Sequence, residues 1–220
     1  MKASHPFQLK GKNSRFIHST LWMNEKNVSK TAVLLPGFEY GCEAPVFYFL
    51  RLLLAEKGYN VLTVDCRYNE NFHYLQMSGT DRLLYFNEEQ TLIAEQLASV
   101  LNYEEYVFAA KSEGTSALIE MIFSGIISGI IEKSRLIWMT PAQRNAEIVE
   151  YIRESFQPSL YIACENDGFF NAELIESLYD HSGTECMIVP EADVLFGKKD
   201  DTTASIDNVK SVLSFIDSNF

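Results

Sequence analysis

The chain has 220 residues, of which 47% are hydrophobic and 22% charged, so it can bury a full core without disulfide or metal staples. Its formal net charge is −12, and an acidic chain repels the phosphate backbone, so nucleic-acid binding is not expected. The longest mostly apolar run, residues 119–131, is too short and too interrupted by glycine and serine to span a bilayer. Residues 1–16 lack the apolar core of a signal peptide, which predicts a cytoplasmic protein without a membrane partner.

The elements predicted from hydrophobic periodicity and turn residues alternate along the chain. In chain order they are an opening pair of strands over 6–10 and 15–22, a strand over 31–36, a helix over 44–59, a strand over 60–66, a loop over 67–80, a helix over 81–101, a strand over 105–111, a helix over 114–130, a strand over 134–140, a helix over 142–156, a strand over 158–166, a helix over 171–181, a strand over 184–192 and a helix over 205–220.

The strands that follow the opening pair are apolar on both faces. This pattern predicts a single α/β domain over residues 1–220, in which a mostly parallel sheet is covered by helices on both sides as a three-layer α/β/α sandwich. In such sheets the functional crevice lies at the carboxyl ends of the strands. The residues that directly follow each strand are therefore the first candidates for a site.

Cysteine and glycine patterns do not indicate a cofactor. The four cysteines make no CxxC pair and are interpreted as small buried hydrophobes: Cys42, Cys66, Cys164 and Cys186. No glycine-rich phosphate-binding motif is present in the sequence. We therefore expect neither a metal nor a nucleotide cofactor, and we expect the partner to be a small-molecule substrate or ligand. The oligomeric state cannot be read from the sequence.

Ser112 lies where a predicted strand becomes a predicted helix, in the stretch Ala110-Lys111-Ser112-Glu113-Gly114. A nucleophilic serine on such a sharp turn needs small residues two positions before and after it, and Ala110 and Gly114 meet that need. A serine at this place can equally be an ordinary N-terminal helix cap. The pentapeptide by itself leaves both interpretations open.

The whole chain, from about residue 6 to residue 218, resembles the α/β-hydrolase family in a small form without a lid domain. The stretch "AAKSEG" is similar to the family's nucleophile elbow, and "LPGFEYGCEAP" is similar to its loop after the third strand. The resemblance implies the α/β-hydrolase fold and a nucleophilic Ser112. It also implies an oxyanion hole formed by the backbone N–H groups of Phe38 and Glu113.

The same resemblance supplies an acid but not a histidine. Asp167, in "ACENDGFF", matches the position of the family's catalytic aspartate, although an aspartate there can also be a simple turn residue. The family's histidine falls at Val194, in "EADVLF", and no histidine follows His181. Without a base a serine hydroxyl stays protonated and is a poor nucleophile.

Few other residues can replace the missing base. Three of the four histidines lie away from the predicted site: His18 in an opening strand, His181 at a helix end and His5 near the amino terminus. His73, in a loop at the catalytic edge, is therefore the candidate base. The alternative interpretation is that His73 is an ordinary solvent-exposed loop residue. Lys111 offers a Ser-Lys arrangement in principle, but side chains that flank an elbow usually point away from the nucleophile. The Glu113 carboxylate would lie close to the oxyanion hole, where its negative charge disfavours an oxyanion, and it can be a sign of altered chemistry.

Two hypotheses result. The first is a serine hydrolase of small carboxylic esters or related acyl compounds with an incomplete triad. The second is a non-catalytic protein of the same fold that binds a small molecule or a protein.

Overall fold

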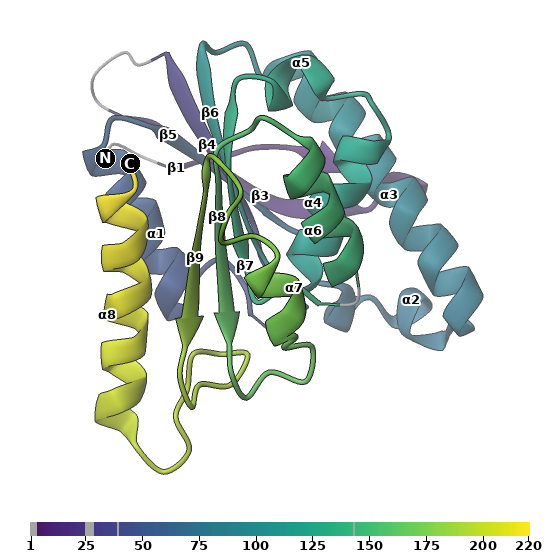
Figure 1. The fold of residues 1–220 in the computed structure, drawn as a ribbon. Coiled ribbons are helices and arrows are strands. Elements are labelled where there is room, and N and C mark those ends of the chain that lie inside the picture. Colours follow the sequence, from purple (N-terminus) through teal and green to yellow (C-terminus); the bar gives the residue numbers. More distant parts are fainter. Residues whose placement is uncertain (1–3, 25–28, 39, 143) are drawn as a thin grey trace.

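The structure is a computed structural model that describes residues 4–24, 29–38, 40–142 and 144–220, with only the backbone described for 4–6. One nine-stranded sheet runs through it in the order β1-β3-β5-β4-β6-β7-β8-β9, with β2 paired to β3 beside this path (Figure 1). The first strands pair antiparallel, and β5, β4, β6, β7, β8 and β9 are parallel to one another. The strands are β1 (Ser4–Pro6), β2 (Leu9–Lys10), β3 (Phe16–Trp22), β4 (Lys30–Leu35), β5 (Asn60–Asp65), β6 (Glu105–Lys111), β7 (Ser134–Met139), β8 (Ser159–Cys164) and β9 (Thr184–Val189).

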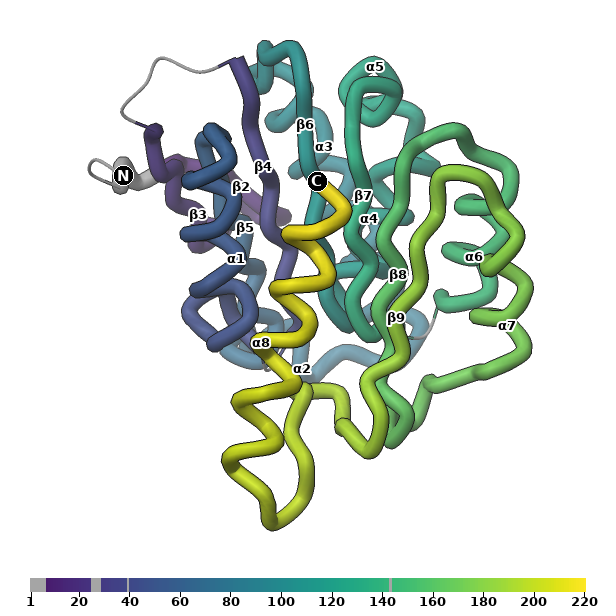
Figure 2. The backbone as a smooth tube through the Cα atoms, turned by 60° about the vertical axis from the view of Figure 1, so that its left-hand side comes forward, coloured from purple at the N-terminus to yellow at the C-terminus, as the bar shows by residue number. Residues whose placement is uncertain are grey.

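Helices cover both faces of the sheet, which confirms the predicted three-layer α/β/α fold. Helices α1 and α8 pack together on one face, and the remaining long helices lie on the other, as Figures 1 and 2 show from two sides. Strand β6 illustrates the division, because Phe108 and Ala110 belong to one core cluster while Val107 and Ala109 belong to the other. The α-helices are α1 (Pro45–Glu56), α2 (Phe72–Gln76), α3 (Gly79–Val100), α4 (Glu113–Phe123), α5 (Ser128–Ile131), α6 (Asn145–Glu154), α7 (Ala172–Glu176) and α8 (Thr202–Ser218).

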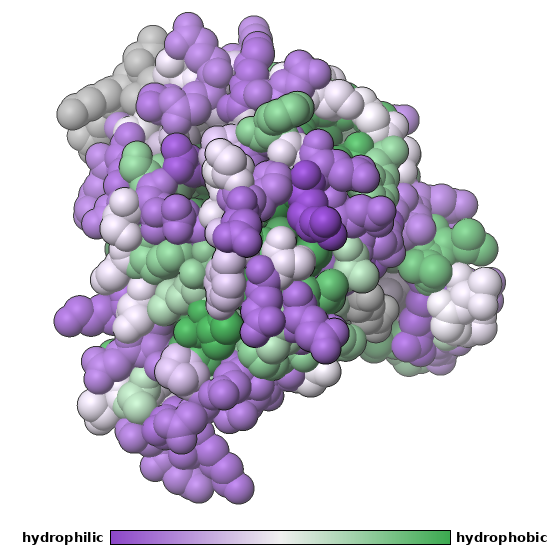
Figure 3. All heavy atoms as spheres, in the orientation of Figure 1, coloured by the Kyte–Doolittle hydropathy of each residue, from purple (hydrophilic) through white to green (hydrophobic). Residues whose placement is uncertain are grey.

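The surface follows from this layering. Hydrophilic residues cover most of the face seen in Figure 3, and hydrophobic ones show between α8 and the strands. A groove of about 660 Å³ lies between α1 and α8, with an apolar lining that includes Phe49, Leu195, Ile206 and Val209. Among the described residues, no helix is both long enough and apolar enough to cross a membrane.

Three predicted elements differ from the structure. The loop predicted over 67–80 contains the 3-10 helix η2 (Tyr68–Glu70) and helix α2, whose first turn is capped by the Asn71 side chain accepting the Tyr74 N–H. The helix predicted over 114–130 is divided into α4 and α5 because Gly125 adopts a φ of +73°, which ends α4. The helix predicted over 171–181 is the short α7, and turns follow it.

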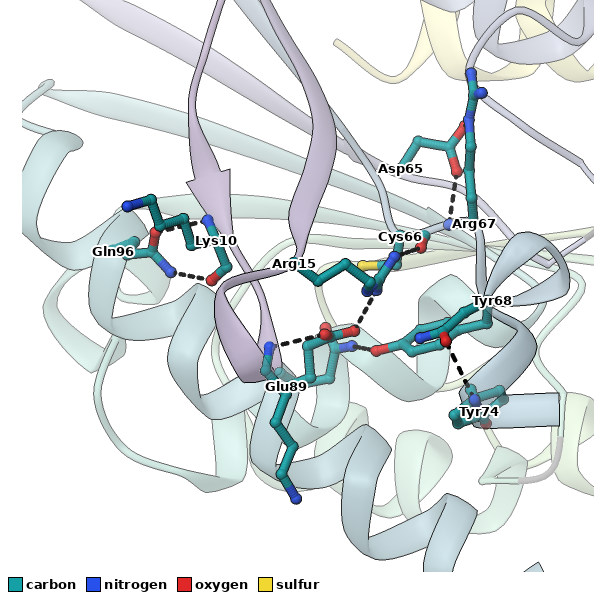
Figure 4. A network of polar contacts seen from close by, with 12 residues as sticks. Lys10, Arg15, Asp65, Cys66, Arg67, Tyr68, Tyr74, Glu89 and Gln96 are labelled. Carbon is teal, nitrogen blue, oxygen red and sulfur yellow. Dashed lines mark hydrogen bonds and ion pairs between the residues drawn. The ribbon is translucent and has the colours of Figure 1, made fainter. Parts of the chain in front are cut away.

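A buried ion pair fastens the opening strands to helix α3 (Figure 4). Between β2 and β3, the 3-10 helix η1 (Lys12–Ser14) leads to Arg15, whose Nη2 donates to Glu89 Oε2 at 2.6 Å. Glu89 is fully buried and also accepts the Lys12 N–H at 2.9 Å, while Arg15 Nη1 donates to the Cys66 carbonyl. Gly11 permits this approach, because a Cβ there would lie 2.2 Å from Glu89 Oε1. The Glu89–Arg15 pair thus fixes the turn between β2 and β3 relative to α3 and to the end of β5.

We expect Glu89→Ala to lower the free energy of unfolding by about 3 kcal/mol, because it removes one partner of a buried pair and leaves the Arg15 charge uncompensated. Glu88→Ala is the matched control. Glu88 is exposed and pairs with Lys12 at the surface, so its loss should change stability by less than about 1 kcal/mol. Urea unfolding of both variants measures the difference, and equal effects would show that the buried pair does not anchor the hairpin.

Candidate active site

Ser112 stands between strand β6 and helix α4 in a strained backbone conformation. Its φ is +51° and its ψ is −123°, a region that non-glycine residues rarely adopt. The strain is imposed by the abrupt change from strand to helix, in which the Thr115 N–H already bonds back to the Ser112 carbonyl at 2.9 Å. Arg67, Thr140 and Glu191, which follow β5, β7 and β9, also have positive φ. Backbone strain therefore gathers at the carboxyl edge of the sheet.

Gly114 allows the turn to press against the neighbouring strand β4. A Cβ at Gly114 would lie 2.0 Å from the carbonyl oxygen of Leu35 and 2.7 Å from that of Pro36. Ala110, two residues before the serine, is fully buried in the sheet. Gly37 lies on the opposite side of the same contact, where a Cβ would come within 3.0 Å of the Ser112 Cβ. The need for small residues around Ser112 thus has a direct steric cause.

The side chain of Glu113 bridges Ser112 and the loop after β4. Ser112 Oγ donates to Glu113 Oε2 at 2.7 Å, and the Phe38 N–H donates to the same oxygen at 3.3 Å. One carboxylate oxygen therefore lies where the resemblance predicts that an oxyanion would bind. The first contact has the short length of a charge-assisted hydrogen bond, and the second is long and weak.

Lys111 points away from Ser112 into the buried layer beneath α1. It is fully buried, and its Nζ donates to Thr140 Oγ1 at 3.2 Å and to the Val194 carbonyl oxygen. Its ammonium also lies 4.4 Å from the centre of the Tyr40 ring. Burial lowers the pKa of Lys111 to about 8, although four acidic groups favour the charged form: Cys164, Asp167, Glu113 and Asp193.

Asp167 and Val194 lie on neighbouring loops after β8 and β9. Asp167 Oδ1 accepts the Phe169 N–H at 3.0 Å, as a turn aspartate does. Burial raises the pKa of Asp167, Glu113 and Asp193 raise it further, and the Phe169 N–H and Lys111 oppose the shift. Val194 is partly buried, and its carbonyl holds the Lys111 ammonium. The catalytic role of Asp167 stays a prediction.

His73 lies on α2 with an exposed side chain, and its ring faces Tyr85 at 6.4 Å between centroids. Within the described residues no hydrogen bond joins it to Ser112, so its role as a base also stays a prediction. His18 is exposed on β3, and His181 bonds Thr184 Oγ1 and the Arg153 carbonyl. The side chain of His5 lies outside the described residues. No group of three metal-ligating side chains gathers in the part of the chain that the structure describes.

Two further residues contact this site: Gln90, which sequence reasoning passed over, and Thr140, which it marked only by its place at a strand end. Gln90 of α3 is fully buried and lines a small cavity together with Glu113 and Phe38. Its sequence signal is a pair of polar residues, Glu89 and Gln90, on the helix face that also carries Phe86 and Ile93. Thr140 bonds Lys111 from the end of β7, for which the sequence offered no signal beyond its place after a strand.

Comparison with known proteins identifies the fold. No family model and no curated protein matches the sequence. Among solved structures, a predicted CIB-like hydrolase from Thermoplasma acidophilum is similar over 98% of this chain and 99% of its own, with a TM-score of 0.64 and 16% identity. A dienelactone hydrolase from Anabaena variabilis matches over 99% and 96%, with a TM-score of 0.64 and 15% identity. A serine hydrolase without lid from Xanthomonas campestris matches over 100% and 94%, with a TM-score of 0.62 and 12% identity.

These structures cover nearly the whole chain, with TM-scores of 0.62 to 0.64. The protein therefore has the α/β-hydrolase fold. Among the described residues between Pro141 and Pro158 the only helix is α6, so that part of the chain holds no lid domain. At these identities the likeness concerns the fold, and the chemistry has to be argued from the site itself.

We expect Gly114→Ala to lower the free energy of unfolding by about 2 kcal/mol or more, because the added methyl group overlaps the Leu35 carbonyl. Gly79→Ala is the matched control, since nothing lies within 4 Å of a Cβ at that position in the first turn of α3. It should leave stability unchanged or raise it slightly. Thermal unfolding compares the two variants, and a Gly114→Ala protein as stable as the control would refute the close contact.

Lys111 should make stability depend on pH. Its pKa is about 8 in the folded protein and 10.5 ordinarily, so between these values the unfolded chain binds more protons and stability rises with pH. The free energy of unfolding of the wild type minus that of Lys111→Met should therefore increase from pH 8 to pH 10.5. Lys133→Met, at an exposed position, is the matched control for the removal of a lysine. Urea unfolding measures the free energy of unfolding of each protein across this pH range. The same pH dependence in the wild type and in Lys111→Met would contradict the burial of the Lys111 charge.

Proposed function

We propose that this protein is a serine hydrolase that cleaves small carboxylic esters or related acyl compounds, with Ser112 as the nucleophile. The observation that carries the proposal is the strained conformation of Ser112 at the start of α4, with its hydroxyl and the Phe38 N–H directed at one common oxygen position. A substrate carbonyl oxygen that took this position would accept the Phe38 N–H as negative charge develops on it.

The remaining parts of the proposed machinery have separate roles. The Glu113 N–H belongs to the first turn of α4, where backbone donors have no partner within the helix, and it is the second donor to the oxyanion. Asp167 contributes negative charge at the neighbouring loop, and His73 is the imidazole on that edge of the sheet. The absence of a lid domain favours a small substrate over a lipid aggregate.

A non-catalytic binding protein of the same fold is the second candidate. Two observations favour it: Val194 stands where related enzymes carry histidine, and the Glu113 carboxylate fills the position that a substrate oxygen needs. In that case Ser112 serves only to hold the turn.

A serine-directed fluorophosphonate probe separates the two candidates. We expect slow covalent labelling of the wild type and complete loss of labelling in Ser112→Ala, because the probe reacts with an activated serine oxygen. Ser128→Ala, at an exposed serine of α5, is the control and should label as the wild type does. Circular dichroism confirms that each protein is folded. A folded wild type that never labels would overturn the hydrolase and leave the binding protein.

A further inference from the structure

A small, partly open cavity lies behind the Ser112 turn. Its volume is about 20 Å³, enough for one water molecule, and Gln90, Glu113, Phe38 and Tyr68 are among its lining residues. Gln90 is fully buried, and its Oε1 has no hydrogen-bond partner among the described residues. An unpaired buried amide oxygen costs about 1–3 kcal/mol, so a donor in the cavity is energetically favoured.

The orientation of the Gln90 amide follows from its neighbours. Burial, followed by the nearby Cys66 and Glu89, raises the pKa of Tyr68 well above its ordinary value, so Tyr68 keeps its proton. The Tyr68 oxygen then accepts from Gln90 Nε2 at 2.7 Å, which leaves Gln90 Oε1 as an acceptor. The network in Figure 4, which begins at Arg15 and Glu89, thus ends at the wall of the active site.

Glu113 is the group that faces this wall from the other side, and its Oε2 already accepts the Ser112 hydroxyl. Two acceptors, an amide oxygen and a carboxylate, line one cavity of water size. A water molecule has two O–H donors and can satisfy both.

We propose that the Glu113 carboxylate is the proton acceptor for Ser112, and that a buried water held by Gln90 positions it. This proposal rests on the proposed hydrolase function and names its base. Glu113 is then a catalytic residue, because it touches the reacting oxygen, and Gln90 is a positioning residue.

The two contacts of Glu113 explain how it and a substrate share the site. The 3.3 Å contact with the Phe38 N–H is weak, so the Glu113 carboxylate turns away from it when a substrate carbonyl oxygen takes the position of Oε2, and it then accepts the Ser112 proton from its new orientation. When Glu113 takes the serine proton it becomes neutral. The repulsion between its charge and the oxyanion therefore disappears as the oxyanion forms.

The reaction balances without a further reactant except water. Ser112 Oγ bonds to the acyl carbon as its proton moves to Glu113, the bond to the alkoxy group breaks, and that proton leaves with the alcohol. Water then gives a proton to Glu113 and bonds to the acyl carbon, and Ser112 Oγ departs with the proton. The net change is an ester plus water to an acid plus an alcohol.

Several ionisable groups interact electrostatically with Glu113 or line its cavity. Lys111 of β6 attracts its negative charge, and Asp167, on the loop after β8, repels it. Tyr74 of α2 also interacts with it electrostatically. Three more ionisable side chains line the cavity: Cys66, Arg67 and Tyr68.

The decisive comparison measures hydrolysis of a p-nitrophenyl acetate probe by the full-length protein. We expect Glu113→Gln to lower kcat about 100-fold or more, and the matched exposed control Glu132→Gln to leave it unchanged. Loss of kcat in His73→Ala, with Glu113→Gln unaffected, would instead assign the proton acceptor to the His73 imidazole and overturn the role of Glu113.

The positioning role has its own measurement. Gln90→Met should lower kcat about tenfold with KM unchanged, because the carboxylate loses its support while the substrate contacts remain. Gln96→Met removes the same group from the same helix, where Gln96 bonds Lys10 instead, and should retain kcat. A high-resolution crystal structure should show a water within hydrogen-bond distance of Gln90 Oε1 in the wild type and none there in Gln90→Met.

The outcomes separate the two proposals. Hydrolysis lost in Ser112→Ala but unchanged in Glu113→Gln would overturn the role of Glu113 and leave the hydrolase standing. A dry cavity in the wild-type crystal would overturn the positioning role of Gln90. No Ser112-dependent hydrolysis or labelling in any folded variant would overturn the hydrolase function, and the role of Glu113 with it.

Discussion

The close approach of Gly114 to the backbone of strand β4 is the constraint on which the site depends. A Cβ at this position would lie 2.0 Å from the Leu35 carbonyl oxygen, so only glycine lets helix α4 begin this close to the neighbouring strand. That approach brings Ser112 beside Gly37 and directs its hydroxyl toward the region of the Phe38 N–H. The positive φ of Ser112 is the local cost of the arrangement, and the packed sheet on both sides sustains it.

Around this turn, charge is arranged in two layers that the backbone of β6 separates. Lys111 lies beneath the turn, where its ammonium donates to the Val194 carbonyl and so fixes the loop after β9. Glu113 lies above it, bonded to Ser112 and Phe38. Because successive side chains of a strand point to opposite faces, the lysine next to the serine cannot be its base. The carboxylate on the first residue of the helix can reach the hydroxyl directly.

Much of the fold is predictable because its signals are local. The apolar strands and amphipathic helices indicate a parallel sheet covered on both faces, and the pentapeptide around Ser112 indicates its turn. The short helices η2 and α2 were not predicted, because they depend on the Asn71 cap and on Tyr74 packing against its aromatic neighbours Phe38, Tyr68 and Tyr85. The end of α4 at Gly125 was missed because its apolar periodicity continues through the glycine.

The sequence by itself determined which chemical groups are present at the carboxyl edge of the sheet: a serine between small residues, an aspartate after a later strand, and valine where a histidine is expected. Only the tertiary structure decided which of them meet. Contact between Glu113 and the Phe38 N–H joins residues 75 positions apart, and Lys111 reaches Val194 across 83 positions. Such distances depend on how the strands pair and how tightly their ends pack, which no local pattern encodes. The hydroxyl partner of Ser112 is its chain neighbour Glu113, and packing decides that the same carboxylate oxygen also meets the Phe38 N–H.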